Sequence, residues 1–290
     1  MQKIIKKYWK NGSLSFLLIA ATFICLLRLS WLKYGDLIVD VGREMYVPLQ
    51  ILSGKLLYRD FCYIYGPFSP YFNALLFKIF GVSLYSLIIC GIITTSAACL
   101  LVYKISRFFL NVFFSTFAVL TFLVVLAFGQ YLYLGNYNFI LPFSYGSIHS
   151  IVFALAATYF FYLWLLKEKS SSKYLAGFFI TLAILAKIEV GIALLIAVAS
   201  ATLLDNITAE KKLSKRILLH QLCAYILLPV SIAASFYILL WVKGADLSYP
   251  VFEMFFLNTN RQFLFPRWLS GIENLSQNLG IIGLAFLYYL

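Results

Sequence analysis

Residues 108–166 read FFLNVFFSTFAVLTFLVVLAFGQYLYLGNYNFILPFSYGSIHSIVFALAATYFFYLWLL and contain no Asp, Glu, Lys or Arg. A helix needs about 20 mostly apolar residues to cross the hydrocarbon core of a bilayer. The stretch therefore predicts two spans, residues 108–128 and 147–166, joined by an uncharged loop. Basic residues flank it, Arg107 before and Lys167 after. Both flanks are expected on the same side of the membrane.

The composition of the whole chain also indicates a membrane protein. Of its 290 residues, 63% are hydrophobic and only 12% are charged, with a mean hydropathy of +0.91. About a quarter of the residues of a soluble domain are charged, so these values exclude a soluble enzyme, a disordered chain and a nucleic-acid-binding domain. The net charge of +12 does not imply a nucleic-acid partner, because basic residues orient membrane proteins. The sequence predicts an all-α, polytopic transmembrane helical bundle.

Further apolar runs predict the remaining spans. Residues 174–204 would make one helix of roughly 46 Å, much longer than a hydrocarbon core of about 30 Å. Lys187 and Glu189 interrupt this run, so we expect two short crossings that turn near residues 187–191. Residues 279–290 are too few to span, which predicts that the chain is the amino-terminal part of a longer protein. The other predicted spans are residues 14–32, 82–103 and 217–241.

The distribution of charge predicts the orientation. Residues 1–13, 104–107, 167–173 and 205–216 together hold 13 Lys and Arg against 3 acids, whereas the rest of the chain is nearly balanced. The positive-inside rule places these four segments in the cytoplasm. We therefore expect a multi-pass protein of the plasma (inner) membrane with a cytoplasmic amino terminus. The first outer loop, residues 33–81, is then expected on the outer, periplasmic side.

This outer loop holds nine charged residues in a chain that otherwise avoids charge. Its pattern predicts an amphipathic helix over residues 40–53, with Asp40 as N-cap, Pro48 as a kink and Gly54 as its end. A second short helix is expected over residues 71–80, ending at Gly81. The side chains expected on the buried face of the first helix are Val41, Met45, Leu49 and Leu52.

Several short motifs of the loop carry a family resemblance. They are Asp40-Val41-Gly42-Arg43-Glu44-Met45, Ser53-Gly54, Tyr58-Arg59-Asp60, Gly66-Pro67 and Leu76-Phe77-Lys78-Ile79-Phe80-Gly81. Together they resemble the first outer loop of the GT-C glycosyltransferases, in the bacterial branch similar to protein mannosyltransferases and the lipid A aminoarabinose transferase. The downstream segments 138–145 and 185–189 resemble this branch as well. The resemblance implies that residues 1–290 form a transmembrane glycosyltransferase module of GT-C type.

The resemblance implies a reaction and a catalytic group. GT-C enzymes transfer a sugar, hexosyl or pentosyl, from a polyprenyl-phosphate donor to an acceptor at the outer face of the membrane. An inverting transfer needs a carboxylate that removes the proton of the attacking hydroxyl, and Asp40 matches the family's general base. Asp60 matches a position that orients the acceptor, although it could instead pair with Arg59 or Arg43. Glu44 could support the site or serve the structure alone.

Cationic groups are needed to stabilise the departing phosphate. The candidates are Arg43, Arg59 and Lys187; the two arginines could instead attract lipid headgroups. Related enzymes often carry a lysine before the loop proline, whereas Tyr65-Gly66 stands before Pro67 here. No cofactor or metal is expected, although Asp40, Glu44 and Asp60 could in principle hold a divalent cation. The expected partners are the polyprenyl-phosphate sugar, an acceptor of unknown class and membrane lipid.

Two other classes of protein remain open at this stage. A multi-span transporter or flippase of a lipid-linked or small solute would also carry charge at a broken helix, as at Lys187 and Glu189. An O-antigen ligase or polymerase would share the lipid-linked substrate. Other polar residues favour neither class: His149 is expected at the membrane interface and His220 far from the loop. The tyrosines of the second outer loop could stack on sugar, line a lipid groove or form an aromatic belt; they are Tyr131, Tyr133, Tyr137 and Tyr145.

Overall fold

The computed structural model describes residues 12–33, 38–129, 138–167, 170–208, 221 and 223–248. Over these ranges the chain is helical and contains no strand. The predictions that concern Tyr131, Tyr133, Tyr137, His220 and residues 279–290 lie outside the described residues. So do the basic residues that precede Gly12 and those of segment 209–216.

The structure confirms an all-α bundle of membrane-spanning helices. Five helices are long and apolar enough to cross a bilayer, and two shorter apolar helices accompany them. Large apolar side chains such as Phe117, Ile196 and Trp241 are exposed, as expected of surfaces in contact with lipid. The long helices are α2 (Ser13–Ser30), α5 (Leu84–Ser106), α7 (Tyr145–Lys167), α9 (Ile188–Thr208) and α11 (Leu228–Val242), the last preceded by a π-helical turn at Cys223–Leu227.

The third predicted span begins later than the sequence suggested. Its helix, α6 (Val112–Thr121), continues as a π-helical segment over Phe122–Ala127. Asn111 caps this helix, since its side chain accepts a hydrogen bond from the Phe114 amide at 3.1 Å. Phe108 and Phe109 belong to the turn after α5. The sequence placed them in the span because apolar character alone does not distinguish a helix from a turn at the membrane surface.

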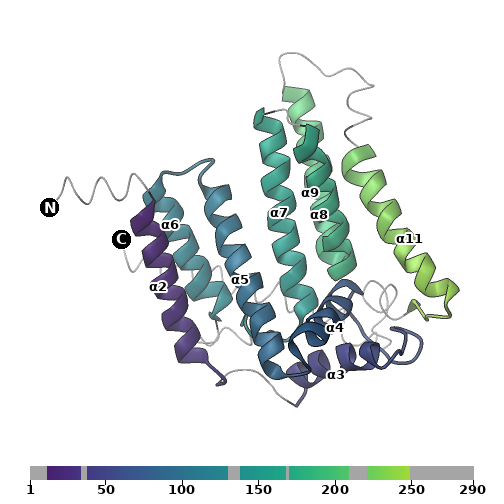
Figure 1. The fold of residues 1–290 in the computed structure, drawn as a ribbon. Coiled ribbons are helices and arrows are strands. Elements are labelled where there is room, and N and C mark those ends of the chain that lie inside the picture. The colour runs from purple at the N-terminus through teal and green to yellow at the C-terminus, as the bar shows by residue number, and fades with distance from the viewer. Residues whose placement is uncertain are drawn as a thin grey trace, which may run out of the picture.

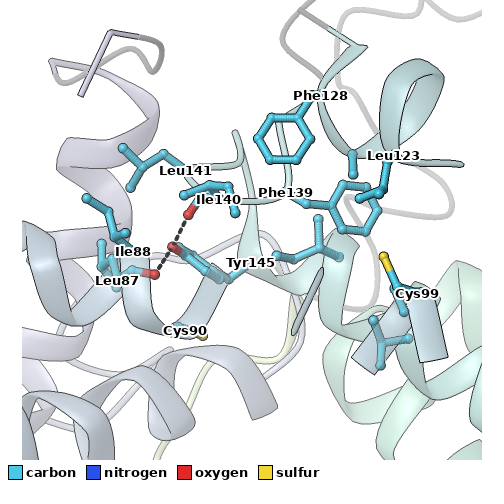
Figure 2. Close-up of a cluster of buried hydrophobic side chains, with 14 of the residues drawn as sticks. Leu87, Ile88, Cys90, Cys99, Leu123, Phe128, Phe139, Ile140, Leu141 and Tyr145 are labelled. Atoms are coloured by element: carbon cyan, nitrogen blue, oxygen red, sulfur yellow. Dashed lines mark hydrogen bonds between the residues drawn. The ribbon is translucent and has the colours of Figure 1, made fainter. Parts of the chain in front are cut away.

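The helices form two neighbouring groups (Figure 1). The first contains α2, α5 and α6, and the second contains α7, α9, α11 and the short helix α8 (Ser170–Ala186). Helix α5 packs against α7 and joins the two groups. Figure 2 shows part of a hydrophobic core, where Leu123, Phe128 and Phe139 pack together.

The predicted break of the long apolar run is present. Helix α8 ends at Ala186 and α9 begins at Ile188, so that Lys187 stands between two helices that pack side by side. Gly191 permits the sharp reversal: a methyl group added there would lie 2.5 Å from the side chain of Ile184. The stretch is therefore two helices, of which α8 is the shorter.

The outer loop contains two helices that lie across one end of the bundle, α3 (Asp40–Leu52) and α4 (Phe68–Phe80) (Figure 1). The predicted ends at Gly54 and Gly81 are confirmed, and both glycines have the left-handed backbone that favours this residue. Helix α4 starts one turn earlier than predicted, because Pro67 precedes its first residue and Pro70 is tolerated within the first turn.

Two details of α3 differ from the prediction. Val39, not Asp40, is the N-cap, and Asp40 is the first helical residue. The buried face consists of Val41, Glu44, Val47 and Pro48, whereas Leu49 and Leu52 are exposed. The bundle end covers one side of α3 only, and that side is not the one with the most leucines.

Candidate functional site

Four segments meet where α3 crosses the end of the bundle: the first turn of α3, residues 63–66, the start of α7 and the α8–α9 break. The Gly66 amide donates a hydrogen bond to the Ala186 carbonyl at 3.2 Å. A methyl group added to Gly66 would lie 2.1 Å from the Leu185 carbonyl oxygen, and one added to Gly146 would lie 3.0 Å from that of Ala186. Two glycines thus allow the loop and α7 to contact the backbone of the break directly.

Arg43 is surrounded by acceptors. Its Nη2 lies 3.3 Å from Oδ1 of Asp40 and also donates a hydrogen bond to the Phe143 carbonyl. Its Nε lies 3.6 Å from Oε1 of Glu44. Helical spacing explains the Asp40 contact, because residues three apart share one face of α3. The side chains of Arg43 and Asp40 both remain about a quarter exposed, so ligands can reach them.

Lys187 approaches the same place from the other half of the chain. Its Nζ donates a hydrogen bond to Oγ of Ser147 at 3.3 Å and lies 5.5 Å from the centre of the Tyr65 ring. The guanidinium carbon of Arg43 lies 5.6 Å from the same ring centre. Tyr65 thus brings together two cations that are 144 positions apart in the sequence, both within the range of a cation–π interaction.

Glu44 has a different environment from Asp40, although both belong to α3. Its side chain is buried, and the Tyr63 hydroxyl donates a hydrogen bond to its Oε1 at 3.3 Å. Burial raises the pKa of the Glu44 carboxyl to about 7, against the opposing effects of Arg43, the Tyr63 hydroxyl and the Tyr145 amide. Glu44 is therefore suited to hold Arg43 and Tyr63 in place from the protein side.

Arg59 and Asp60 lie apart from this set. They form a two-point ion pair, with Nε to Oδ1 at 2.9 Å and Nη2 to Oδ2 at 3.0 Å, and the Leu56 amide also donates to Asp60. The hydrogen bonds from Arg59 and Leu56 lower the pKa of the Asp60 carboxyl to about 2. Of the two partners expected for Asp60, the structure shows Arg59. The carboxylates of Asp40, Glu44 and Asp60 consequently do not converge, and the described part of the chain contains no group of three metal-ligating side chains.

The helix break does not pair Lys187 with Glu189. Lys187 contacts Ser147 and Tyr65, and the buried Oε2 of Glu189 has no hydrogen-bond partner among the residues that the structure describes. Beside the break, α9 and α11 border an apolar groove of about 520 Å³. Its lining includes Ile184, Ile188, Ile192, Tyr237 and Trp241.

Two further residues that stood out in the sequence, His149 and Tyr145, are buried in the structure. His149 is buried, with Nδ1 2.8 Å from the Ser69 hydroxyl and Nε2 3.4 Å from the Cys90 sulfur. Tyr145 is also buried rather than exposed in the outer loop, because it is the first residue of α7 (Figure 2). Its hydroxyl donates to the carbonyls of Leu87 and Ile140 at 2.7 and 3.0 Å, so it can neither stack on sugar nor join an aromatic belt.

The sequence did not single out Tyr65 or Ser147 for the site. Tyr65 stands out in the sequence only as the residue before Gly66-Pro67, where related enzymes often carry a lysine. The available signal was the pair of glycines, Gly66 and Gly146, each next to a residue of the site. A glycine beside an apolar span often marks a close approach of two backbones.

The comparisons with known proteins bear on this arrangement. A family model described as dolichyl-phosphate-mannose-protein mannosyltransferase matches residues 65–236. No curated protein and no solved structure gave a significant match. The matched region begins at Tyr65, contains Lys187 and covers more than half of the chain. The chain therefore belongs to the dolichyl-phosphate-mannose-protein mannosyltransferase family, membrane glycosyltransferases of the GT-C type that use lipid-linked sugar donors.

Proposed function

We propose that the protein transfers a hexosyl or pentosyl group from a polyprenyl-phosphate donor to an acceptor at the outer face of the plasma membrane, with inversion at the anomeric carbon. Asp40 is the general base, and Arg43 and Lys187 bind the phosphate of the donor. The observation that carries the proposal is the convergence of this carboxylate and these two cations at one end of the bundle, around Tyr65.

The chemistry follows from these three groups. The acceptor hydroxyl oxygen attacks the anomeric carbon while its proton passes to the Asp40 carboxylate. The bond between the anomeric carbon and the phosphate oxygen breaks, and its electron pair stays on the departing polyprenyl phosphate. Negative charge thus grows on the phosphate, where two fixed cations stabilise the transition state more than the ground state.

The surroundings support a lipid-linked donor. The apolar groove between α9 and α11 is bordered by Ile184 and Ile188, on either side of Lys187 in the sequence. An isoprenoid chain in this groove places its phosphate near the break. Glu44 supports Arg43 from the buried side. Arg59 and Asp60 neutralise each other in an exposed ion pair, and we assign them to the shape of the loop, not to the reaction.

The direct test replaces the base. Asp40→Asn keeps the size and polarity of the side chain but cannot accept the proton, so sugar transfer in membranes is expected to fall by at least about a hundredfold. The measurement is transfer of a radiolabelled sugar from a polyprenyl-phosphate donor by the full-length protein. Asp246→Asn is the matched control, because Asp246 is an exposed acid whose side chain accepts a hydrogen bond from the Ser248 amide and contacts none of the site residues that the structure describes. Full activity of Asp40→Asn would overturn the assignment of the base.

A transporter or flippase is the second candidate, and the charged break between α8 and α9 favours it. The same membranes distinguish the two functions. A flippase moves the lipid-linked sugar across a vesicle bilayer without forming a new glycosidic bond, whereas a transferase yields labelled acceptor and unlabelled polyprenyl phosphate.

A further inference from the structure

We infer that Tyr65 is a positioning residue whose ring fixes the spacing of Arg43 and Lys187 and so shapes the binding site for the donor phosphate. The inference rests on the proposed function, since it concerns the phosphate of the same donor. It assigns a role to a residue that neither touches the sugar nor carries charge.

The two cations need such a support. Arg43 and Lys187 carry like charges that repel each other when no phosphate is bound. The face of an aromatic ring carries partial negative charge, and cations within about 6 Å of its centre are attracted to it. Both cations lie within that range of Tyr65. The ring therefore attracts both positive groups to one position in the empty site, beside the carboxylates that contact Arg43.

Tyr65 is held in place through its backbone and its ring. The Tyr65 carbonyl accepts a hydrogen bond from the Tyr58 hydroxyl at 2.5 Å, and the Tyr63 ring contacts the Tyr65 ring edge-on at 5.6 Å. The next residue, Gly66, bonds to the Ala186 carbonyl immediately before Lys187. Tyr65 is thus anchored to the break that carries one cation, and through Tyr63 and Glu44 to the helix that carries the other.

The hydroxyl and the ring of Tyr65 have separable parts in this arrangement. The Ser144 side chain lies beside the hydroxyl, whereas the ring faces the cations. Tyr65→Phe therefore removes the hydroxyl contact and leaves the support of the cations. Tyr65→Leu removes both.

The experiment compares these variants in the purified full-length protein reconstituted in lipid nanodiscs. The measured quantities are KM and kcat for a polyprenyl-phosphate sugar, and the Kd for undecaprenyl phosphate as a probe of the phosphate site. We expect Tyr65→Phe to stay within about twofold of the wild type. Loss of two cation–π contacts in Tyr65→Leu is expected to raise KM and Kd by about tenfold. The matched control is Tyr71→Leu, a half-buried loop tyrosine that touches Phe236 and neither cation; we expect wild-type values.

A second series of variants preserves the shape of the side chain at position 65 and serves if Tyr65→Leu does not fold. Phenylalanine, 4-fluorophenylalanine and 3,4,5-trifluorophenylalanine at position 65 have nearly the same shape, but fluorine withdraws electron density from the ring face and weakens its attraction for cations. We expect KM and Kd to rise stepwise along this series. Equal values along the series, or a loss of kcat with unchanged KM and Kd, would overturn the role of Tyr65.

The outcomes separate this inference from the proposed function. If the wild type binds undecaprenyl phosphate but transfers no sugar, the proposed transfer is wrong, and the Kd values still decide the role of Tyr65. If the wild type transfers sugar and the fluorinated series is flat, the transfer stands and the role of Tyr65 is wrong. If the wild type neither binds nor transfers, both are wrong.

Discussion

Asp40 and Glu44 show how one turn of helix gives two carboxylates different environments. Asp40 is partly exposed and contacts the guanidinium of Arg43, whereas Glu44 is buried beneath that residue. A carboxyl that takes up a proton from an acceptor must be reachable from outside, and Asp40 meets this condition. The raised pKa of Glu44 follows from its burial, which also closes the carboxyl off from an acceptor.

This burial predicts a dependence of stability on pH. The pKa of the Glu44 carboxyl is raised from 4.5 to about 7 in the folded protein. As pH rises from about 4.5 to about 7, the unfolded chain releases this proton before the folded one does, and stability falls by up to about 3 kcal/mol. Glu44→Gln removes this loss and retains an acceptor for the Tyr63 hydroxyl. We expect its Tm in detergent to exceed that of the wild type by several degrees at pH 8.

The pH series contains its own control. Below about pH 3.5, Glu44 is protonated in both the folded and the unfolded chain, so the wild type and Glu44→Gln should have the same Tm. A difference in Tm that stays constant between pH 4.5 and pH 8 would contradict the prediction and indicate a change in packing instead.

At this scale the sequence identifies the charged groups but not their partners. Asp40, Arg43, Glu44 and Lys187 stand out because charge is scarce in this chain. Their grouping depends on which residues of the loop reach the α8–α9 break, and that contact joins segments more than 100 positions apart. Tyr65 is one tyrosine among 21, and the glycine that follows it, Gly66, is the signal that the sequence offers.

At the scale of elements, the α8–α9 break was predictable and the buried face of α3 was not. The break follows from length, since 31 apolar residues exceed the thickness of a bilayer. The buried face of α3 depends on where the other helices end, which hydrophobic periodicity does not reveal. The leucines at positions 49 and 52 accordingly remain exposed, while Glu44 is buried.

The contact between the loop and the break predicts the effect of Gly66→Ala. The added methyl group would lie 2.1 Å from the Leu185 carbonyl oxygen, and backbone must move to accommodate it. We expect a loss of about 1–3 kcal/mol in stability and a fall of at least about tenfold in kcat/KM, because Tyr65 shifts with its neighbour. Thermal unfolding and sugar transfer measure the two effects.

Gly54→Ala is the control for this variant. Gly54 also has little tolerance for a side chain, because its φ is +86°, but a methyl group there meets no atom within 4 Å. It should cost about 1 kcal/mol through the backbone alone and leave kcat/KM nearly unchanged. Equal losses of activity in both variants would show that the contact with Leu185 does not matter for the site.

At the scale of the whole molecule, the helices alternate in direction and place the ends of α5 and α7 and the starts of α6 and α8 away from α3 (Figure 1). Lys104, Arg107 and Lys173 belong to these ends. The separation of the basic ends from the outer loop agrees with the order of spans predicted from hydropathy. Hydropathy supplies this order because each span is recognised independently, but it contains no information on which helices touch.

The orientation of the bundle can be tested with the native Cys62, which is exposed in the outer loop. A membrane-impermeant maleimide is expected to label it in intact cells, because positive-inside orientation puts this loop outside. In a Cys62→Ser background, Leu110→Cys in the turn before α6 should react only after the cells are made permeable. The opposite orientation would follow if, in intact cells, the Leu110→Cys variant is labelled and Cys62 of the wild type is not.

Helix α8 contains 17 residues and α9 contains 21, which correspond to lengths of about 25 and 31 Å. A bilayer whose hydrocarbon core matches α9 is therefore about 5 Å too thick for α8. Since Lys187 alone separates the two helices, they meet at the same depth at the break, and the shortfall of α8 falls at its other end, near Lys173. The lipid surface on that side of the membrane is therefore expected to dip toward the start of α8.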